Sequence, residues 1–415
     1  MRPQVAAGAE TLEEPARALP DLSRTYRVRQ FPGFAHLPAS YRTLLDGEIE
    51  RLGLFREPEW FGYLMRNFFK EAHELRLYGL EEADSGRPLL LAPLCDGTGD
   101  YAVKKGHVIG SISHPENYTT AALVFDPAVE HPVPVLEALF RHLRSHSPDG
   151  NPQRFDAVRI WPVELDSELG DTIHQALRRA GFIVQSYANS FNRYEDTTGL
   201  SHEAYFAQRS ANMRYNVRRR QRALEKTGGL EFILATSPAD LQSAISDYMS
   251  VSRASWKSPG SMFASEMLEL LSLCAVKGYL RLGILRLDGK AVAVQFWIVS
   301  GGTAHCARLA YDEAYKKLAV GVVLTNFMIA HVLDHDHVNK LDYGYGRDDY
   351  KRGWMRDARE YYGFIAFNSS TPIGRLSAIR HIQGRRLKRL LKRGLGVLGW
   401  KRFKSRDLEK PADQA

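Results

Sequence analysis

The chain has 415 residues, of which 44% are hydrophobic and 11% aromatic, with a net charge of +8. This length and composition predict two or three ordinary globular domains of the soluble α/β or α+β class. No window approaches 18 uninterrupted apolar residues and the first twenty residues lack an apolar core, so we expect neither a spanning helix nor a secretory signal. The widely spaced Cys95, Cys274 and Cys306 argue against a disulfide framework or a cysteine zinc site, so we expect a cytoplasmic protein.

The positive charge is concentrated near the C-terminus. Residues 371–406 contain 12 Lys or Arg and no Asp or Glu, which leaves 44 basic and 48 acidic residues elsewhere. Apolar residues are interleaved with these basic residues, a composition typical of a helix that lies on an anionic membrane face. We therefore expect residues 371–415 to form a basic amphipathic tail that holds the protein peripherally at the inner membrane. A solvated tail and a nucleic-acid contact are the alternatives.

The first half of the chain predicts a mixed set of strands and helices. Residues 1–50 are expected to be an extension with at most one helix, near Tyr41–Gly53. A hairpin follows, with its turn at Asp84-Ser85-Gly86. The remaining predicted elements are strands at 101–109 and 120–125, a helix at 134–145, a strand at 155–161, a helix at 166–180 and a strand at 182–194.

The densest basic helix of the body is predicted between the two halves. Residues Glu203 to Lys226 contain no Pro or Gly, and Gly228-Gly229 is a plausible stop. Its arginines cover more than one face, so the helix cannot bury its whole circumference. Phosphate is one expected partner, because the guanidinium presents a planar set of donors, and interdomain salt bridges are the other.

The clearest pattern lies between residues 279 and 346. Asp288-Gly289 and Gly301-Gly302 are turn signals that predict an antiparallel meander of three strands. A helix is expected from Val320 to Val332, and a right-handed crossover would place the next strand, Lys340–Tyr343, parallel to its predecessor. This order is typical of an acetyltransferase-type fold, in which the N-terminus of that helix can receive the pyrophosphate of an acyl carrier.

The same order of meander, helix and strand occurs in both halves. We therefore predict two copies of one α/β unit, each a mixed sheet with an antiparallel meander flanked by helices, joined near Thr197–Ser201.

Several blocks in the second half resemble a known family. They are YMSVSRASWKS, GYLRLGILRLDGKAVAVQFWIV, YDEAYKKLAVGVVL and LDYGYGRDDYKRGW, in this order. They resemble the acetyltransferase domain of the CelD type, also called the BioF-like acetyltransferase domain. This is a branch of the GNAT superfamily related to the FemAB peptidoglycan-bridge enzymes, and the resemblance spans residues 55–367.

The resemblance implies two tandem GNAT-like lobes, residues 51–198 and 199–370. It also implies direct transfer of an acyl group from acyl-CoA or an acyl carrier protein to an amine, in cell-envelope or polysaccharide biosynthesis. The amine would be small or part of an envelope precursor, acyl-CoA would be a co-substrate, and no cofactor would be bound permanently.

The carrier-binding loop departs from the superfamily pattern Gln/Arg-x-x-Gly-x-Gly/Ala, since only Gly321 remains. We predict that Lys316, Lys317, Val320 and Gly321 bind the donor. The donor can be acyl-CoA, a carrier protein or, as in FemAB enzymes, aminoacyl-tRNA held by the arginine-rich helix. A non-catalytic binding module is a further alternative.

Acyl transfer to an amine requires a base and a proton donor for the leaving group. We predict Asp342 as the base or as a carboxylate that orients the acceptor, Tyr345 as the proton donor and His305 as a third catalytic candidate. Structural roles in a polar loop and in a strand are the alternatives. A period of two would place His305 with Ala307, and Arg308 with Cys306. The predicted substrate-binding residues are Arg253, Trp256, Arg308, Tyr311, Tyr350 and Lys351.

The histidine cluster at residues 331–337 is the most metal-like group in the sequence. The segment ends a helix, where the dipole favours His, and it lacks an HExxH motif, so we expect no metal.

Overall fold

The computed structural model describes residues 25–69, 73–100, 103–113, 120–146, 154–255, 265–346 and 349–382. The strands are β1 (Tyr26–Phe31), β2 (Glu74–Glu82), β3 (Pro88–Asp100), β4 (Val103–Ser111), β5 (Val124–Phe125), β6 (Ala157–Glu164), β7 (Phe182–Asp196), β8 (Leu230–Ala235), β9 (Leu280–Leu287), β10 (Lys290–Ser300), β11 (Thr303–Tyr311), β12 (Lys340–Tyr345) and β13 (Asp357–Asn368). The helices are α1 (Ala39–Leu52), α2 (Pro58–Phe68), α3 (Pro132–Ser145), α4 (Glu168–Arg179), α5 (His202–Ala207), α6 (Ala211–Lys226), α7 (Pro238–Arg253), α9 (Ser265–Val276), α10 (Val320–Asp334) and α11 (Asp349–Trp354), with 3-10 turns η2 (Phe34–His36), η3 (Gly53–Arg56) and η4 (Glu313–Leu318). A further helix covers 372–382.

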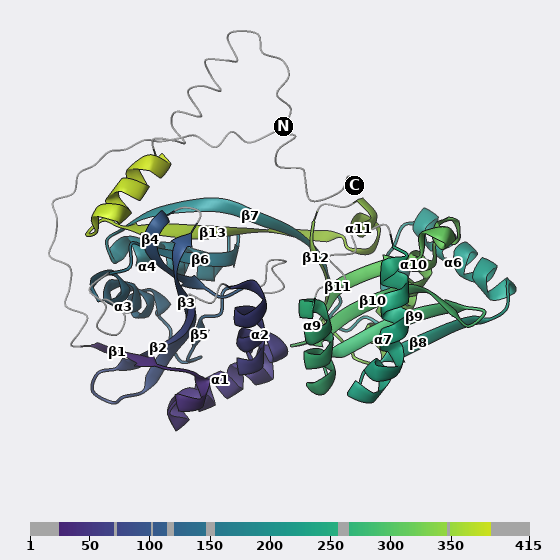
Figure 1. The fold of residues 1–415 in the computed structure, drawn as a ribbon, viewed down its shortest axis with the longest axis horizontal. Coiled ribbons are helices and arrows are strands. Elements are labelled where there is room, and N and C mark those ends of the chain that lie inside the picture. The colour runs from purple at the N-terminus through teal and green to yellow at the C-terminus, as the bar shows by residue number, and fades with distance from the viewer. Residues whose placement is uncertain are drawn as a thin grey trace, which may run out of the picture.

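One mixed sheet runs through both halves of the molecule. Its order is β1-β2-β3-β4-β6-β13-β7-β12-β11-β10-β9-β8, with β5 beside β3. Figure 1 shows β7 and β13 as long strands that cross from one group of elements to the other. The predicted α/β class, with mixed sheets flanked by helices, is confirmed.

The first half contains the predicted meander followed by a parallel strand. β2, β3 and β4 pair antiparallel, and β4 pairs parallel with β6. β13 lies between β6 and β7 and is antiparallel to both, so residues near the end of the described chain complete this sheet. β1 was not predicted; it pairs with β2 at the sheet edge, where its alternating arginines reach solvent.

The second half confirms the predicted meander and crossover. Asp288 and Gly289 have φ of 50° and 76°, and Gly301 and Gly302 have φ of 53° and 67°. Positive φ at both central residues is what a two-residue hairpin turn requires, and it matches the twist of the flanking strands. β12 runs parallel to β11 but pairs with it only from Thr303 to His305, so the two strands separate beyond that point.

The basic helix predicted from Glu203 to Lys226 is two helices, α5 and α6, so that prediction is wrong. The hydroxyl of Ser210 caps α6 by accepting from the N–H of Met213. The intervening Arg209 is buried, and its guanidinium contacts the buried carboxylate of Glu195 on β7 at 2.6 Å. A continuous helix would move Arg209 away from Glu195 and leave a buried charge without a partner, which is very unfavourable. The chain therefore breaks the helix at Arg209 and keeps the ion pair.

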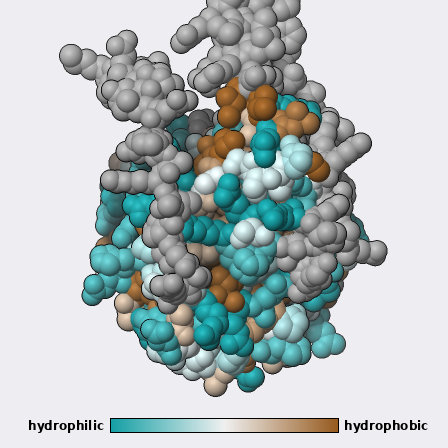
Figure 2. Space-filling model, turned by 90° about the vertical axis from the view of Figure 1, so that its left-hand side faces the viewer, coloured by the Kyte–Doolittle hydropathy of each residue, from teal (hydrophilic) through white to brown (hydrophobic). Residues whose placement is uncertain are grey.

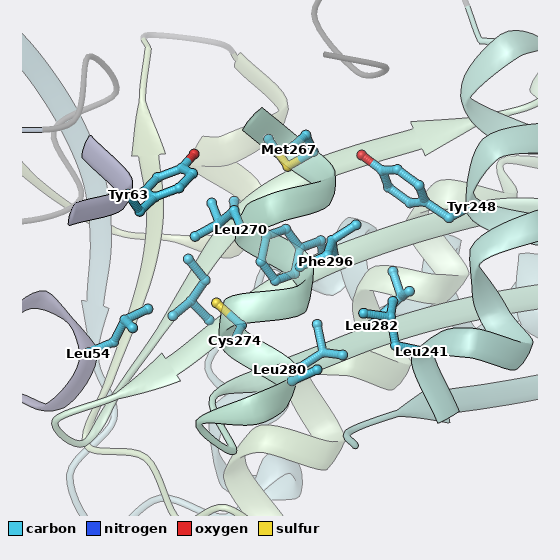
Figure 3. Packing of buried hydrophobic residues seen from close by; sticks show 14 of the residues in the cluster. Leu54, Tyr63, Leu241, Tyr248, Met267, Leu270, Cys274, Leu280, Leu282 and Phe296 are labelled. Carbon is cyan, nitrogen blue, oxygen red and sulfur yellow. The ribbon is translucent and has the colours of Figure 1, made fainter. Parts of the chain in front are cut away.

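The hydrophobic core of the second half includes residues from the beginning of the chain. Met267, Leu270 and Cys274 of α9 pack over Leu280 and Phe296 of the sheet (Figure 3). The same cluster contains Leu54 of η3 and Tyr63 of α2. The segment 53–68 therefore packs against the second sheet region and connects the two halves.

Candidate functional site

A cavity of about 380 Å³ opens at the N-terminus of α10, on the side of the sheet that α10 covers. It lies where β11 has separated from β12, and α6 and α11 contribute its outer wall. The described residues that line it are Arg220, Leu309, Tyr311, Lys316, Ala319, Val320, Gly321, Val322, Thr325, Tyr350 and Trp354. We call it the α10 cavity.

The loop before α10 gives the α10 cavity its shape. The carboxylate of Asp312 caps η4 by accepting from the N–H of Ala314, and Ala319 then turns into α10 with φ of 55°. The carbonyl of Gly321 accepts from the hydroxyl of Thr325 at 2.9 Å and from the amide of Gln295 at 3.2 Å. The first turn of α10 is thus held against β10. The N–H groups of Val322 and Val323 donate to the carbonyl of Ala319 at 3.0 and 3.3 Å, so Val320 and Gly321 are the residues whose N–H groups the helix end presents to a ligand.

The α10 cavity combines apolar walls with two cations. Lys316 is exposed at the mouth, with its ammonium 3.5 Å from the carboxylate of Glu313. Arg220 approaches from α6 and is half-buried. Burial raises the pKa of Tyr311, so its phenol stays protonated at neutral pH. A helix N-terminus with two nearby cations is a favourable environment for a diphosphate.

A second cavity, of about 760 Å³, lies between the two halves of the molecule. Its described lining residues are Glu48, Arg51, Leu52, Phe55, Arg56, Thr120, Ala121, Leu123, Phe125, Pro127, Glu164, Leu169, Ser300, Gly301, Thr303, His305, Lys340, Arg359 and Tyr361. We call it the inter-half cavity.

The two cavities lie on opposite faces of the sheet. His305 and its register partner Asp342 belong to the face of the inter-half cavity. Cys306 and Tyr343, one residue further along each strand, belong to the core under α10. Side chains of a strand alternate between the two faces of the sheet. The last paired segment of β11 and β12 therefore directs side chains toward both cavities and separates one cavity from the other.

A β-bulge in β11 changes the face of Arg308. Phe296 pairs with Arg308 and Trp297 with Cys306, which leaves Ala307 without a partner in β10. Leu309 and Tyr311 consequently line the α10 cavity, and Arg308 between them faces the other side. The prediction that Arg308 shares a face with Cys306 is therefore wrong, since a single sequence pattern does not reveal a bulge.

Asp342 is buried and both of its oxygens are engaged. One accepts from the N–H of Gly344 at 2.7 Å, and the other accepts from the guanidinium of Arg359. Arg359 also lies 3.7 Å from Glu164 and over the ring of Tyr194. Arg359 on β13 thus reaches across β7 to Asp342 on β12, and the two contacts hold the Asp342 carboxyl group in one orientation.

His305 differs from Asp342 in having an unused polar atom. It is buried against the ring of Phe55, at 4.9 Å between centroids, and its Nδ1 has no hydrogen-bond partner among the described residues. Burial lowers its pKa to about 4, opposed by the charge of Asp342. The imidazole is therefore neutral near pH 7 and can accept a hydrogen bond from a ligand in the inter-half cavity.

The charged residues that line the inter-half cavity are mostly cationic. Arg51 and Arg56 share the carboxylate of Glu48, at 2.8 and 3.4 Å. Lys340 lies 5.7 Å from the ring centroid of Tyr194. The described lining residues comprise four Lys or Arg and two Glu, so the cavity favours ligands with an anionic group.

The other predicted site residues are scattered. Tyr350 lines the α10 cavity, whereas Tyr345 is 54% exposed and lines neither cavity. Lys351 is buried and donates to the carbonyl of Tyr345 at 2.6 Å. Arg253 is exposed at the end of α7, and Lys317 is exposed and does not line the α10 cavity. Trp256 lies outside the described residues.

Several residues at these cavities were not predicted from the sequence. Arg220 belongs to the predicted basic helix, but no local signal placed it near α10. Arg359 was not predicted, because its position beside Asp342 depends on where β13 enters the sheet. Thr325 and Trp354 carry no distinctive motif, and they could have been found only from the helical periodicity of α10 and α11.

Within the described ranges, no group of three or more His, Cys, Asp or Glu is arranged to hold a metal ion. In the same part of the chain, none of the helices combines the length and the apolar character needed to cross a bilayer.

The second half of the chain matches the model of a known domain family. Residues 211–352, from α6 to α11, match the family described as "Acetyltransferase (GNAT) domain". The chain therefore contains a GNAT-type acyltransferase fold.

Comparison with solved structures extends the likeness to most of the chain. FemX is similar with a TM-score of 0.52 and 11% identity, over 82% of this chain and 98% of that one, which shows a shared fold. L-PGS from Bacillus licheniformis has a TM-score of 0.46 and 11% identity, over 81% and 95% of the two chains. A tandem GNAT protein from the clavulanic acid biosynthesis pathway has a TM-score of 0.46 and 11% identity, over 82% and 98%. No curated protein matches this chain.

Proposed function

We propose that the protein is an N-acyltransferase that binds an acyl-CoA, or an acyl carrier protein, in the α10 cavity and an amine acceptor in the inter-half cavity. The observation that supports this most directly is that two cavities lie on opposite faces of the sheet at the point where β11 and β12 stop pairing. The donor thioester would reach the amine through that opening.

The proposed reaction needs no covalent enzyme intermediate. The amine nitrogen attacks the thioester carbon, the carbon–sulfur bond breaks, and the amine loses a proton while the thiolate gains one. His305 is the proposed acceptor of the amine proton. Burial lowers its pKa to about 4, so the imidazole is neutral and able to accept near pH 7, and the charge of Asp342 offsets part of the cost of burial once the proton has been transferred. Tyr350 and Tyr345 are similarly exposed, at 50% and 54%, but only Tyr350 lines the α10 cavity, so Tyr350 is the proposed proton donor to the thiolate.

Calorimetric titration with acetyl-CoA, palmitoyl-CoA and free CoA tests the donor site. A bound donor stabilises the native state by mass action, so thermal shift offers a second readout. Lys316→Ala and Arg220→Ala should each weaken binding about 10-fold, since each removes a charge-assisted contact to phosphate. Lys317→Ala and Arg222→Ala are matched controls, because they remove the same charges from exposed positions outside the cavity.

An acceptor comparison tests the inter-half cavity. Release of CoA thiol is measured with glucosamine and with glucosamine 6-phosphate, which differ only in an anionic group. The excess of cationic lining residues predicts a lower KM for the phosphorylated amine, and Lys340→Ala should reduce the difference. Equal KM values would exclude anion recognition while leaving the donor proposal intact. We propose an amine of a cell-envelope or polysaccharide precursor as the natural acceptor.

Two tyrosine variants separate the candidate proton donors. Tyr350→Phe should lower kcat about 10-fold or more with little change in KM, whereas Tyr345→Phe should be near wild type. The opposite result would assign the role to Tyr345.

A FemAB-like aminoacyltransferase is the second candidate, favoured by the fold shared with FemX and by the arginines of α6. In that case tRNA should bind with an affinity that falls steeply with salt, and Arg220→Ala and Arg222→Ala should weaken it alike. No binding of acyl-CoA, carrier protein or tRNA would instead support a non-catalytic binding module.

A further inference from the structure

The helix at 372–382 is fixed on one side to the end of the first half. The hydroxyl of Thr371 accepts from the N–H of Gly374 at 3.1 Å and donates to the buried carboxylate of Asp156 at 2.6 Å. Ala378 is buried in a small cluster with Ile365 and Phe367. The rotation of this helix about its own axis is therefore set by contacts along Thr371, Gly374 and Ala378.

The opposite side of the same helix is apolar and open. Ile373, Leu376 and Ile379 are 41%, 67% and 50% exposed. With 100° per residue, the centre of this face lies about 180° from the centre of the face that carries Gly374 and Ala378. Figure 2 shows hydrophobic residues gathered at the upper end of the molecule, the level at which this helix lies in Figure 1.

Two exposed basic residues accompany the apolar face. At 100° per residue, Arg375 lies at its border, about 100° from the centre, whereas Arg380 lies about 40° from the centre on the other side. Further along, the sequence of residues 383–406, which lies outside the described residues, adds ten Lys or Arg and no Asp or Glu. Apolar side chains bordered by cations are characteristic of a helix that lies in the interface of an anionic bilayer.

An anionic bilayer fits this surface better than a nucleic acid does. Phosphate contacts of a nucleic acid would satisfy the arginines but leave three large apolar side chains in water. A bilayer interface accommodates both, because the apolar face enters the acyl region while the arginines remain among the headgroups.

We propose that Ile373, Leu376 and Ile379, with Arg375 and Arg380, form a docking surface for an anionic lipid bilayer. This surface belongs to the first half of the molecule and lies away from α10 in Figure 1. A protein docked in this way would keep the α10 cavity clear of the bilayer.

Co-sedimentation of the full chain with vesicles tests the proposal. The probes are vesicles of phosphatidylcholine alone and of phosphatidylcholine with phosphatidylglycerol at about one lipid in three. Binding should be at least about 10-fold stronger to the anionic vesicles and should weaken at high salt. The double variant Leu376→Ser with Ile379→Ser should lose about 10-fold or more in affinity at unchanged charge.

Two further variants make the test specific. Val276→Ser on α9 is the matched control, because Val276 is also apolar and is 71% exposed but belongs to the second half of the molecule. This variant should bind the vesicles as the wild type does. Arg375→Gln with Arg380→Gln should weaken binding about 5-fold for each charge, independently of any effect of the serines on folding. Circular dichroism melting should show wild-type transitions for all three variants, because every altered side chain is exposed.

The proposal is overturned if anionic vesicles do not bind the chain, or if the double serine variant binds them as well as the wild type. Binding of RNA that the serine substitutions leave unaffected, without vesicle binding, would assign the basic tail to nucleic acid instead.

Discussion

Lowering the pH should destabilise the folded protein through His305. Its pKa is lowered from 6.5 to about 4 by burial, so between these values the unfolded chain binds a proton that the native chain does not. The stability contributed by neutral His305 is therefore complete above about pH 6.5 and is lost as the pH falls toward 4. Linkage gives a loss of about 2 kcal/mol at about pH 5 relative to about pH 8.

Urea unfolding of the wild type and of His305→Asn at both pH values isolates this contribution. The substitution itself changes the free energy of unfolding at each pH, so the prediction concerns only the change between the two pH values. From about pH 8 to about pH 5, the free energy of unfolding of the wild type should fall by about 2 kcal/mol more than that of the variant. His142→Asn is a matched control, because burial also lowers the pKa of His142 to about 4, and α3 lies outside both cavities. It should reduce the pH dependence similarly while leaving acyl transfer intact.

An equal pH dependence in the wild type and in His305→Asn would refute the reasoning. It would mean that His305 is hydrated, and the proposal that it accepts a hydrogen bond as a neutral imidazole would fail with it.

Three further predictions concern an ion pair, a helix cap and a hairpin turn. Arg359→Met should destabilise the protein by about 3–5 kcal/mol in urea unfolding, because it leaves buried Asp342 unpaired, and adding Asp342→Asn should restore part of the loss. Ser237→Ala, which removes one side of the α7 capping box, should cost about 1 kcal/mol in the same measurement. Gly301→Ala should lower the melting temperature, since φ is +53° and a Cβ would lie 2.7 Å from the Cα of Leu52; an unchanged melting temperature would show that the turn can relax.

Local signals predicted the core of the second half well. Asp288-Gly289 and Gly301-Gly302 permit the positive φ of both hairpins, and an apolar run between β11 and β12 is long enough only for a helix. Lys316, Val320 and Gly321 were predicted together because they are neighbours in the chain at the start of that helix, and the structure shows that they line one cavity. Asp342 and His305, which were predicted separately as catalytic candidates, are register partners.

Long-range contacts decided what the local pattern could not. The break between α5 and α6 depends on a buried contact between Arg209 and Glu195, because helix propensity alone favours continuity through residues 207–211. The bulge at Ala307 depends on how β10 and β11 pack, and it moves Arg308 to the other face.

The sequence by itself determined the two hairpin turns of the second half and the start of α10, because turns, caps and periodicity act over a few residues. Only the tertiary structure decided that β13 enters between β6 and β7, which brings Arg359 to Asp342 and closes one side of the inter-half cavity. The other wall comes from α1 and η3, more than 200 residues before β11. Such a cavity depends on strand pairing and side-chain packing between segments that are far apart in the chain. These interactions cannot be predicted from the pattern of residues in any one segment.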